Sequence, residues 1–142
     1  MKTNIDLHQL VECVGDAIIV SDANEKIVLW NPSATRIFGY TEDEALGQTL
    51  DLIVPERQRQ RHSEGYSKSM QTGATRYGTS LLKVPAKHKD GSTLSIAFTV
   101  GMLFDENHQA NGVVAIIRNE TARFAEERAL KKRIAELENP SA

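Results

Sequence analysis

Residues 15–40 read GDAIIVSDANEKIVLWNPSATRIFGY, and this stretch decides the fold. Two short apolar runs, at 17–20 and 27–30, flank a polar turn, which predicts two antiparallel strands joined as a hairpin. Asn31 and Pro32 then predict the start of a helix, because an Asn side chain caps a helix and Pro lacks the N–H that the first turn leaves unpaired. The stretch therefore combines a hairpin with a helix that follows it directly.

The rest of the chain extends this pattern. Short helices are predicted between residues 32 and 72, and three strands follow at 79–87, 93–104 and 113–117. The Asp90-Gly91 turn favours a hairpin between the first two of these strands. Strands grouped at both ends around a helical block predict an α+β fold, with one five-stranded antiparallel sheet and the helices on one face. The side chains expected to line the space between sheet and helices are Phe38, Ile96, Phe98, Val114 and Ile116.

Three segments are predicted along the chain. Residues 1–15 should form an amphipathic flanking helix, 16–121 the central domain, and 122–142 a C-terminal helix. In the last segment the apolar residues follow a 4–3 spacing over fewer than two heptads, which is a weak signal for a coiled coil. Those residues are Leu130, Ile134 and Leu137.

Composition and charge exclude several classes of function. The chain has 142 residues, 40% of them apolar and 25% charged, which is ordinary for one globular domain. A net charge of −2 gives no basic footprint for nucleic acid or an anionic membrane surface, and no apolar stretch approaches the ~20 residues that cross a bilayer. The single cysteine, Cys13, fits a reducing compartment, so we expect a cytoplasmic protein with Cys13 buried or half-buried in its helix.

An unusual histidine lies on the helix predicted to begin at Pro55. His62, Tyr66 and Met70 stand at positions i, i+4 and i+8, so they share one face of a helix that is otherwise almost wholly polar. Neutral imidazole is the commonest protein ligand for a metal, the iron of haem included. The alternative is a histidine at the edge of the core that is satisfied by a hydrogen bond.

Features of an enzyme are missing from the sequence. There is no glycine-rich phosphate loop, no nucleophile elbow and no spaced set of metal ligands. His8, His88 and His108 fall in terminal or loop segments without partners at metal spacing. We therefore expect a binding domain without catalytic residues.

Four phrases of the sequence resemble the PAS family of sensory domains. They lie at residues 15–22 (GDAIIVSD), 30–40 (WNPSATRIFGY), 88–91 (HKDG) and 118–121 (RNET), the last with Asn119 where the family usually has aspartate. The resemblance implies a sensor within a longer signalling protein that carries an effector domain. It also implies that the helix after residue 121 is the output linker, and that the chain pairs as a homodimer.

Around His62 the sequence is similar to the haem-binding, oxygen-sensing branch of that family, which includes the rhizobial oxygen-sensor kinases and the enterobacterial direct oxygen sensor. The phrase IVPER at 53–57 precedes Arg61-His62. The number of residues from His62 to Asp90-Gly91 is the same as in those sensors, so the two can be aligned over this stretch without a gap. The resemblance implies haem b with His62 as the iron ligand. Lys68 and Arg76 occupy the positions that contact the haem propionates, which suits their positive charge.

The same resemblance predicts the far wall of the haem pocket. Oxygen sensors of this branch place an arginine at the position of Leu82. The direct oxygen sensor has its distal methionine at the position of Ser80. On the next strand the apolar wall corresponds to Ile96, Phe98 and Val100. A wholly apolar wall offers no donor to bound oxygen, so CO or NO should be favoured relative to oxygen.

A second reading is a PAS domain without haem. It would dimerise and relay a signal, with a pocket that is empty or holds a small organic ligand, and His62 would then only donate or accept a hydrogen bond. A photosensing flavin domain needs a cysteine before Pro55, and residues 49–54 (TLDLIV) contain none.

Overall fold

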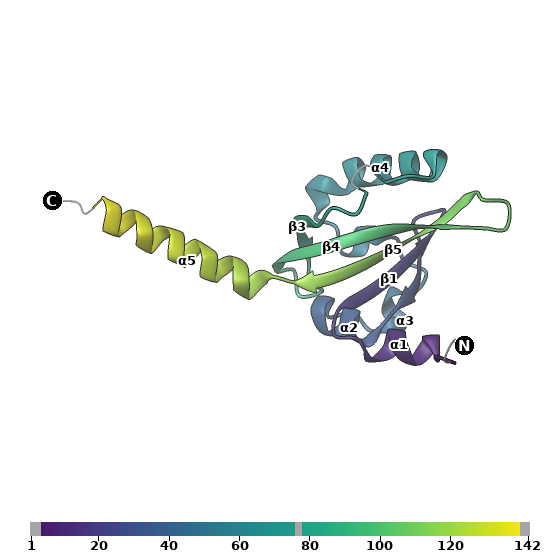
Figure 1. Ribbon diagram of the computed structural model, residues 1–142, viewed down its shortest axis with the longest axis horizontal. Coiled ribbons are helices and arrows are strands. Elements are labelled where there is room, and N and C mark those ends of the chain that lie inside the picture. The colour runs from purple at the N-terminus through teal and green to yellow at the C-terminus, as the bar shows by residue number, and fades with distance from the viewer. Residues whose placement is uncertain (1–3, 76–77, 140–142) are drawn as a thin grey trace.

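The computed structural model describes residues 4–75 and 78–139. They form one antiparallel sheet with the helices between residues 32 and 72 on one face, which confirms the α+β prediction. The order of the five strands is β2-β1-β5-β4-β3. The strands are β1 (Ala17–Asp22), β2 (Ile27–Trp30), β3 (Leu82–Lys87), β4 (Thr93–Phe104) and β5 (Ala110–Asn119). The α-helices are α1 (Leu7–Cys13), α2 (Pro32–Phe38), α3 (Glu42–Ala45), α4 (Arg59–Thr72) and α5 (Thr121–Glu138), with 3-10 turns at Leu50–Leu52 and Glu56–Gln58. Figure 1 shows α4 lying over the sheet and α5 extending away from it.

Asn31 connects the hairpin to the helix that follows, as its place in the sequence predicts. Its side-chain oxygen accepts from the backbone N–H groups of Ile18 and Ala34 at 2.9 and 3.0 Å. Its amide nitrogen donates to the carbonyls of Val11 and Asp16 at 3.0 and 3.1 Å. Because Asn31 is only 2% exposed, these four bonds replace the water that it loses on burial.

Two helix ends follow from local sequence. α2 ends at Gly39, whose φ of 87° lies in the left-handed region, and a Cβ there would stand 2.6 Å from Cε1 of His88. A capping box opens α3: Thr41 accepts from the N–H of Glu44, and the Glu44 carboxylate accepts from the N–H of Thr41. Both features agree with the turn chemistry of the sequence.

The core lies between the sheet and the helices. Phe38 and Ile96 are buried there, and Phe98 packs against them partly buried, as predicted. The other fully or nearly buried apolar side chains of this cluster are Ala17, Ile19, Ile27, Trp30, Ala34, Ala45, Ile53, Ala86, Leu94 and Ile117.

The predicted inward face of β5 is wrong by one residue. Ile117 pairs with Phe98 and is 3% exposed, whereas Ile116 is 37% exposed. Directly paired residues share a face of the sheet, so Ala115 and Ile117 face the helices, and Val114 and Ile116 face the other way. The run from 113 to 117 is apolar at every position, so its alternation carried no information about which face is buried.

Two element boundaries also differ from the predictions. β3 begins at Leu82 rather than at residue 79, because the chain turns at Gly78, with a φ of 57°, and Leu81 remains 58% exposed. The helix that carries His62 begins at Arg59, after a 3-10 turn that follows Pro55, and ends at Gly73 in the left-handed region.

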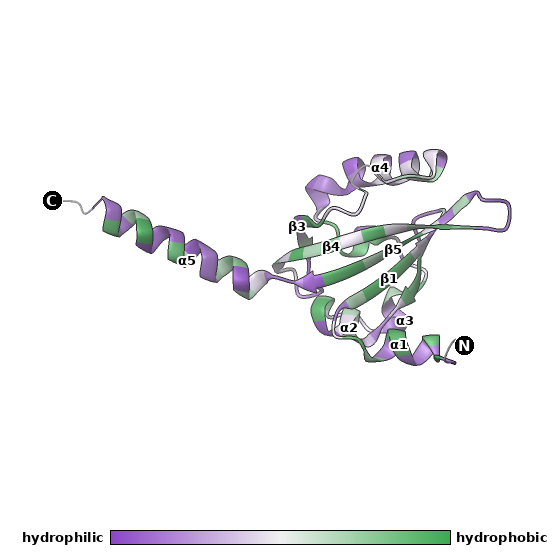
Figure 2. Ribbon diagram, viewed as in Figure 1, coloured by the Kyte–Doolittle hydropathy of each residue, from purple (hydrophilic) through white to green (hydrophobic). Residues whose placement is uncertain are grey.

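The flanking helices carry little buried surface. α1 packs beside α2, and Cys13 is exposed, which contradicts the prediction that it is buried or half-buried. No residue of α5 is buried, and green and purple residues alternate along it in Figure 2. Within residues 4–75 and 78–139, no helix combines the length and the apolar character needed to cross a membrane. The division into segments 1–15, 16–121 and 122–142 stays a prediction.

Candidate functional site

Tyr66 anchors α4 to the end of β1. Its side chain is 8% exposed, and it is the one buried residue of this helix. The phenol oxygen lies 2.8 Å from Oγ of Ser21 and 2.5 Å from the carbonyl oxygen of Asp22. Burial raises the pKa of the Tyr66 phenol, the nearby Glu25 and Asp22 carboxylates raise it further, and the hydrogen bond to Ser21 lowers it. The phenol therefore stays neutral and donates.

One turn earlier in α4, His62 reaches the β1–β2 turn. Its Nδ1 lies 2.9 Å from Oε1 of Glu25, and the hydroxyl of Ser63 donates to Oε2 of Glu25 at 3.0 Å. The side chains of His62 and Glu25 are 37% and 14% exposed. An ionised carboxylate only accepts, so Nδ1 carries the proton, and a neutral ring then has its lone pair on Nε2.

The predicted face of α4 is confirmed by these contacts. The His62 and Tyr66 rings lie with their centroids 6.3 Å apart, and Met70 is half-buried on the same side of the helix. His62 and Tyr66 attach this face to the β1–β2 turn through polar groups, and these bonds help to dock a helix with few apolar residues.

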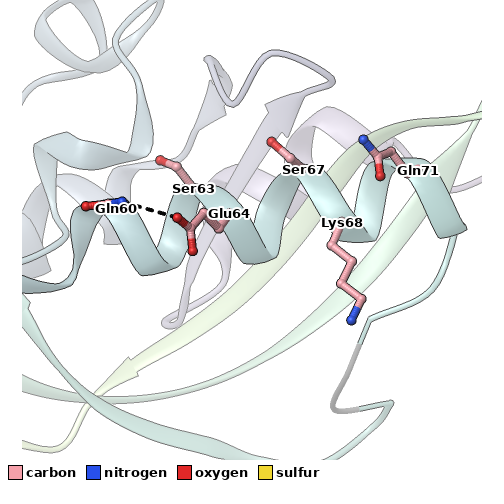
Figure 3. Close-up of a pocket in the computed structure, with 6 residues that line it drawn as sticks. All are labelled: Gln60, Ser63, Glu64, Ser67, Lys68 and Gln71. Carbon is pink, nitrogen blue, oxygen red and sulfur yellow. Dashed lines mark hydrogen bonds between the residues drawn. The ribbon is translucent and has the colours of Figure 1, made fainter.

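A shallow hollow runs along a different face of α4 (Figure 3). The residues that line it are polar and come from this helix alone: Gln60, Ser63, Glu64, Ser67, Lys68 and Gln71. Gln60 donates to Glu64 at 3.3 Å, and the Lys68 side chain extends toward the segment that follows the helix. Lys68 is exposed, and Arg76 lies outside the described residues.

The apolar residues proposed for the far wall share one face of the sheet. Leu82 on β3 pairs directly with Phe98 on β4, and Ile96, Phe98 and Val100 alternate on β4. Ile96 is buried, whereas Leu82, Phe98 and Val100 remain half-exposed. The helix side of the β3–β4 edge therefore carries an apolar surface that the described residues cover only in part.

Glu25 is the site residue that sequence reasoning missed. It lies 37 residues from His62 in the chain, within the polar turn predicted between the first two strands. Among the described residues no group of three or more His, Cys, Asp or Glu side chains is placed to hold a metal ion. His62 with Glu25 is instead a single imidazole with a carboxylate partner.

The exit of the sheet into α5 is closely hydrogen-bonded. The Asn119 side-chain oxygen accepts from the N–H and hydroxyl of Thr121 at 3.0 and 2.6 Å, so asparagine serves here as the expected aspartate would. The Thr121 hydroxyl oxygen accepts from the N–H of Ser95 at 3.0 Å, and the N–H of Glu120 donates to the Ser95 carbonyl at 2.7 Å. These bonds fix the start of α5 to β4.

A five-stranded antiparallel sheet with helices on one face and a helix leaving its central strand defines the PAS class of sensory domains. Residues 5–119 match the family described as the PAS fold, and the chain belongs to that family.

Relatives by sequence include named sensors. The sensor protein FixL of Bradyrhizobium diazoefficiens is 32% identical over 95 residues, which are 67% of this chain and 19% of FixL. The oxygen sensor protein DosP of Escherichia coli is 22% identical over 118 residues, 83% of this chain and 14% of DosP. An uncharacterized protein of Azorhizobium caulinodans is 31% identical over 121 residues, 82% of this chain and 16% of that protein. The chain thus spans less than a fifth of the length of these relatives.

Solved structures confirm the fold. The PAS domain of a Colwellia psychrerythraea protein superposes with a TM-score of 0.71 at 23% identity, covering 82% of this chain and 95% of that one. An RNA-binding light-oxygen-voltage receptor superposes with a TM-score of 0.72 at 16% identity, covering 91% of this chain and 36% of the receptor. At these identities the likeness extends to the fold alone.

Proposed function

We propose that this PAS domain binds haem b through His62, senses a diatomic gas or a redox change, and passes the signal through α5 to an effector domain. The observation that carries the proposal is the 2.9 Å contact between Nδ1 of His62 and the Glu25 carboxylate. Histidines that bind metals commonly donate their other ring N–H to a carboxylate, which orients the ring and makes the free nitrogen a better ligand.

The donor set fits a haem group. One imidazole is the axial ligand that haem proteins of this kind use. The half-exposed apolar side chains of Leu82, Phe98 and Val100 suit the face of a porphyrin, and the Lys68 ammonium suits a propionate. The two relatives named as sensors, one of them an oxygen sensor, support the same function.

When bound, haem would supply an iron atom that takes up a diatomic gas or changes its oxidation state. The chain's own residues would hold the iron through Nε2 of His62 and present apolar side chains on the sheet side. Since Leu82, Ile96, Phe98 and Val100 donate no hydrogen bond from their side chains, this wall would respond to a ligand by steric contact.

The contacts of α4 support a route for the signal. Tyr66 and Glu25 attach α4 to the end of β1, and β1 pairs with β5 along its whole length, from Ala17 with Ile117 to Asp22 with Gly112. β5 continues into Thr121 and α5. A shift of α4 against the sheet would thus change the strand that leads directly to the output helix.

The competing function is a PAS domain without haem that dimerises and relays a signal. The bond from His62 to Glu25 also favours this alternative, because it satisfies one ring nitrogen without any ligand. In that case the half-exposed apolar face of β3 and β4 would contact a small organic ligand or solvent.

A hemin titration followed by absorption spectroscopy separates the two functions. The wild type should develop a Soret band that saturates near one haem per chain. His62→Gln should lose that band, because Gln keeps a donor for Glu25 but is no haem ligand, whereas His8→Gln on α1, whose imidazole is exposed, should titrate as the wild type does. A wild-type protein that is folded and gives only the spectrum of free hemin would overturn the proposal in favour of the alternative.

A further inference from the structure

We infer that Glu25 is a positioning residue: it holds His62 in the tautomer with the proton on Nδ1, so that the Nε2 lone pair is available as a ligand. This inference rests on the proposed function in so far as it concerns iron. Its first part, the tautomer, concerns only the protein.

Both carboxylate oxygens of Glu25 lie within hydrogen-bond distance of side chains on α4. Oε1 lies 2.9 Å from Nδ1 of His62, and Oε2 accepts from the Ser63 hydroxyl at 3.0 Å. His62 and Ser63 are neighbours in the helix, so they hold the carboxylate at both ends and fix its plane. With 14% of its side chain exposed, Glu25 has little access to water as an alternative partner.

The backbone keeps Glu25 in place. Its φ of 66° lies in the left-handed region, the conformation that His108, with a φ of 59°, also adopts in the β4–β5 turn. Asp22 holds the turn together: its carboxylate accepts from the N–H groups of Asn24 and Lys26 at 2.9 and 3.0 Å, and its carbonyl accepts from the N–H of Glu25 at 3.0 Å. The carboxylate therefore projects from a closed turn rather than from a loose loop.

The consequence for His62 is chemical. A neutral imidazole without a partner can place its proton on either nitrogen, and only the nitrogen without a proton can bind a metal. By accepting from Nδ1, Glu25 removes this ambiguity and leaves the lone pair on Nε2. Loss of such a partner typically weakens metal affinity about 10–100-fold.

The tautomer can be measured in the protein without haem. Nitrogen-15 NMR of the His62 ring should show the Nδ1–H tautomer in the wild type. The spectra would be recorded over a pH series that reaches values at which the ring is neutral. Glu25→Ala should shift the ring to a mixture of tautomers. Ser63→Ala is the matched control, because it removes the other bond of Glu25 and leaves that of His62, so it should keep the wild-type tautomer.

A second measurement uses the protein loaded with hemin and then reduced. Glu25→Ala should lower the iron–histidine stretching frequency in resonance Raman spectra and reduce haem affinity about 10–100-fold. Ser63→Ala should produce a much smaller decrease, or none, in both the stretching frequency and the haem affinity. A wild type in the Nε2–H form, or a Glu25→Ala protein with the wild-type tautomer and stretching frequency, would overturn the role of Glu25. A wild type that binds no haem but shows the Nδ1–H tautomer would overturn the proposed function and leave the positioning of His62 by Glu25 supported.

Discussion

Nδ1 of His62 lies 2.9 Å from Oε1 of Glu25, although 37 residues separate the two in the chain. This contact joins α4 to the β1–β2 turn and at the same time determines which nitrogen of the imidazole is free. The same bond thus contributes to docking the helix and, under the proposed function, to preparing a ligand for iron.

Replacing Tyr66 by Phe tests how α4 is attached. The change removes the hydroxyl that contacts Ser21 and Asp22 and takes a partner from the buried Ser21 hydroxyl, so the free energy of unfolding should fall by about 1–2 kcal/mol. Urea denaturation measures the loss. Tyr40→Phe is the control, since no hydrogen bond of the Tyr40 hydroxyl occurs among residues 4–75 and 78–139, and an equal loss in both variants would contradict the anchoring role.

The same side chain predicts a dependence on alkaline pH. The folded-state pKa of Tyr66 is raised above its ordinary value of 10.0, mainly by burial. Between the two values the unfolded chain has lost the phenol proton and the folded chain retains it, so the free energy of unfolding falls as pH rises. The contribution of the neutral Tyr66 phenol to the free energy of unfolding is complete below about pH 10. It is lost as pH rises through the raised pKa of the folded state. Urea denaturation in this range should show a shallower decline in Tyr66→Phe than in the wild type, and identical slopes would count against the raised pKa.

Asn31→Ala should destabilise the domain more strongly. Four backbone groups lose their partner in a buried position, so we expect a loss of about 3 kcal/mol, measured by urea denaturation. Asn107→Ala, in the exposed β4–β5 turn, should change stability by less than about 0.5 kcal/mol. A comparable small effect for both variants would show that the bonds of Asn31 are replaced by water.

Replacing Leu82 by Arg tests the apolar wall in haem-loaded protein. An arginine at this position on β3 would supply a donor for bound oxygen, so oxygen affinity should rise relative to CO, measured by ligand titration in the reduced protein. Leu82→Met is the matched control, because it keeps the side chain apolar. If Leu82→Arg leaves the ratio unchanged while haem stays bound through His62, Leu82 is not part of the wall.

Removing residues 122–142 tests the expected homodimer. α5 exposes Leu130, Ile134 and Leu137 at 62%, 51% and 68%, and an apolar stripe of this kind is normally covered by a partner. Sedimentation equilibrium should show weaker self-association of the truncated chain. A chain that includes residues 122–142 and stays monomeric at high micromolar concentration would refute the dimer.

Local signals in the sequence predicted most of the fold. The helix start at Asn31-Pro32 and the turn at Asp90-Gly91 each depend on neighbouring residues, so the sequence contains all the information they need. The face of β5 was mispredicted because residues 113–117 are apolar throughout, and only the pairing of Ile117 with Phe98 reveals which side is buried.

In the candidate site, too, some features could be predicted from local sequence and others could not. The face shared by His62 and Tyr66 follows from helical spacing, and the face shared by Phe98 and Val100 follows from strand alternation. The role of Glu25 depends on how a turn and a helix meet in three dimensions, and no pattern along the chain encodes that meeting.

The haem content of the purified protein tests the central claim most directly. The protein would be produced with a haem precursor in the medium, and its haem would be counted per chain as the pyridine haemochrome. We predict close to one haem per chain in the wild type and in His8→Gln, and almost none in His62→Gln. A folded wild-type protein that is colourless, or a His62→Gln protein that retains the full haem content, would contradict the assignment of His62 as the iron ligand.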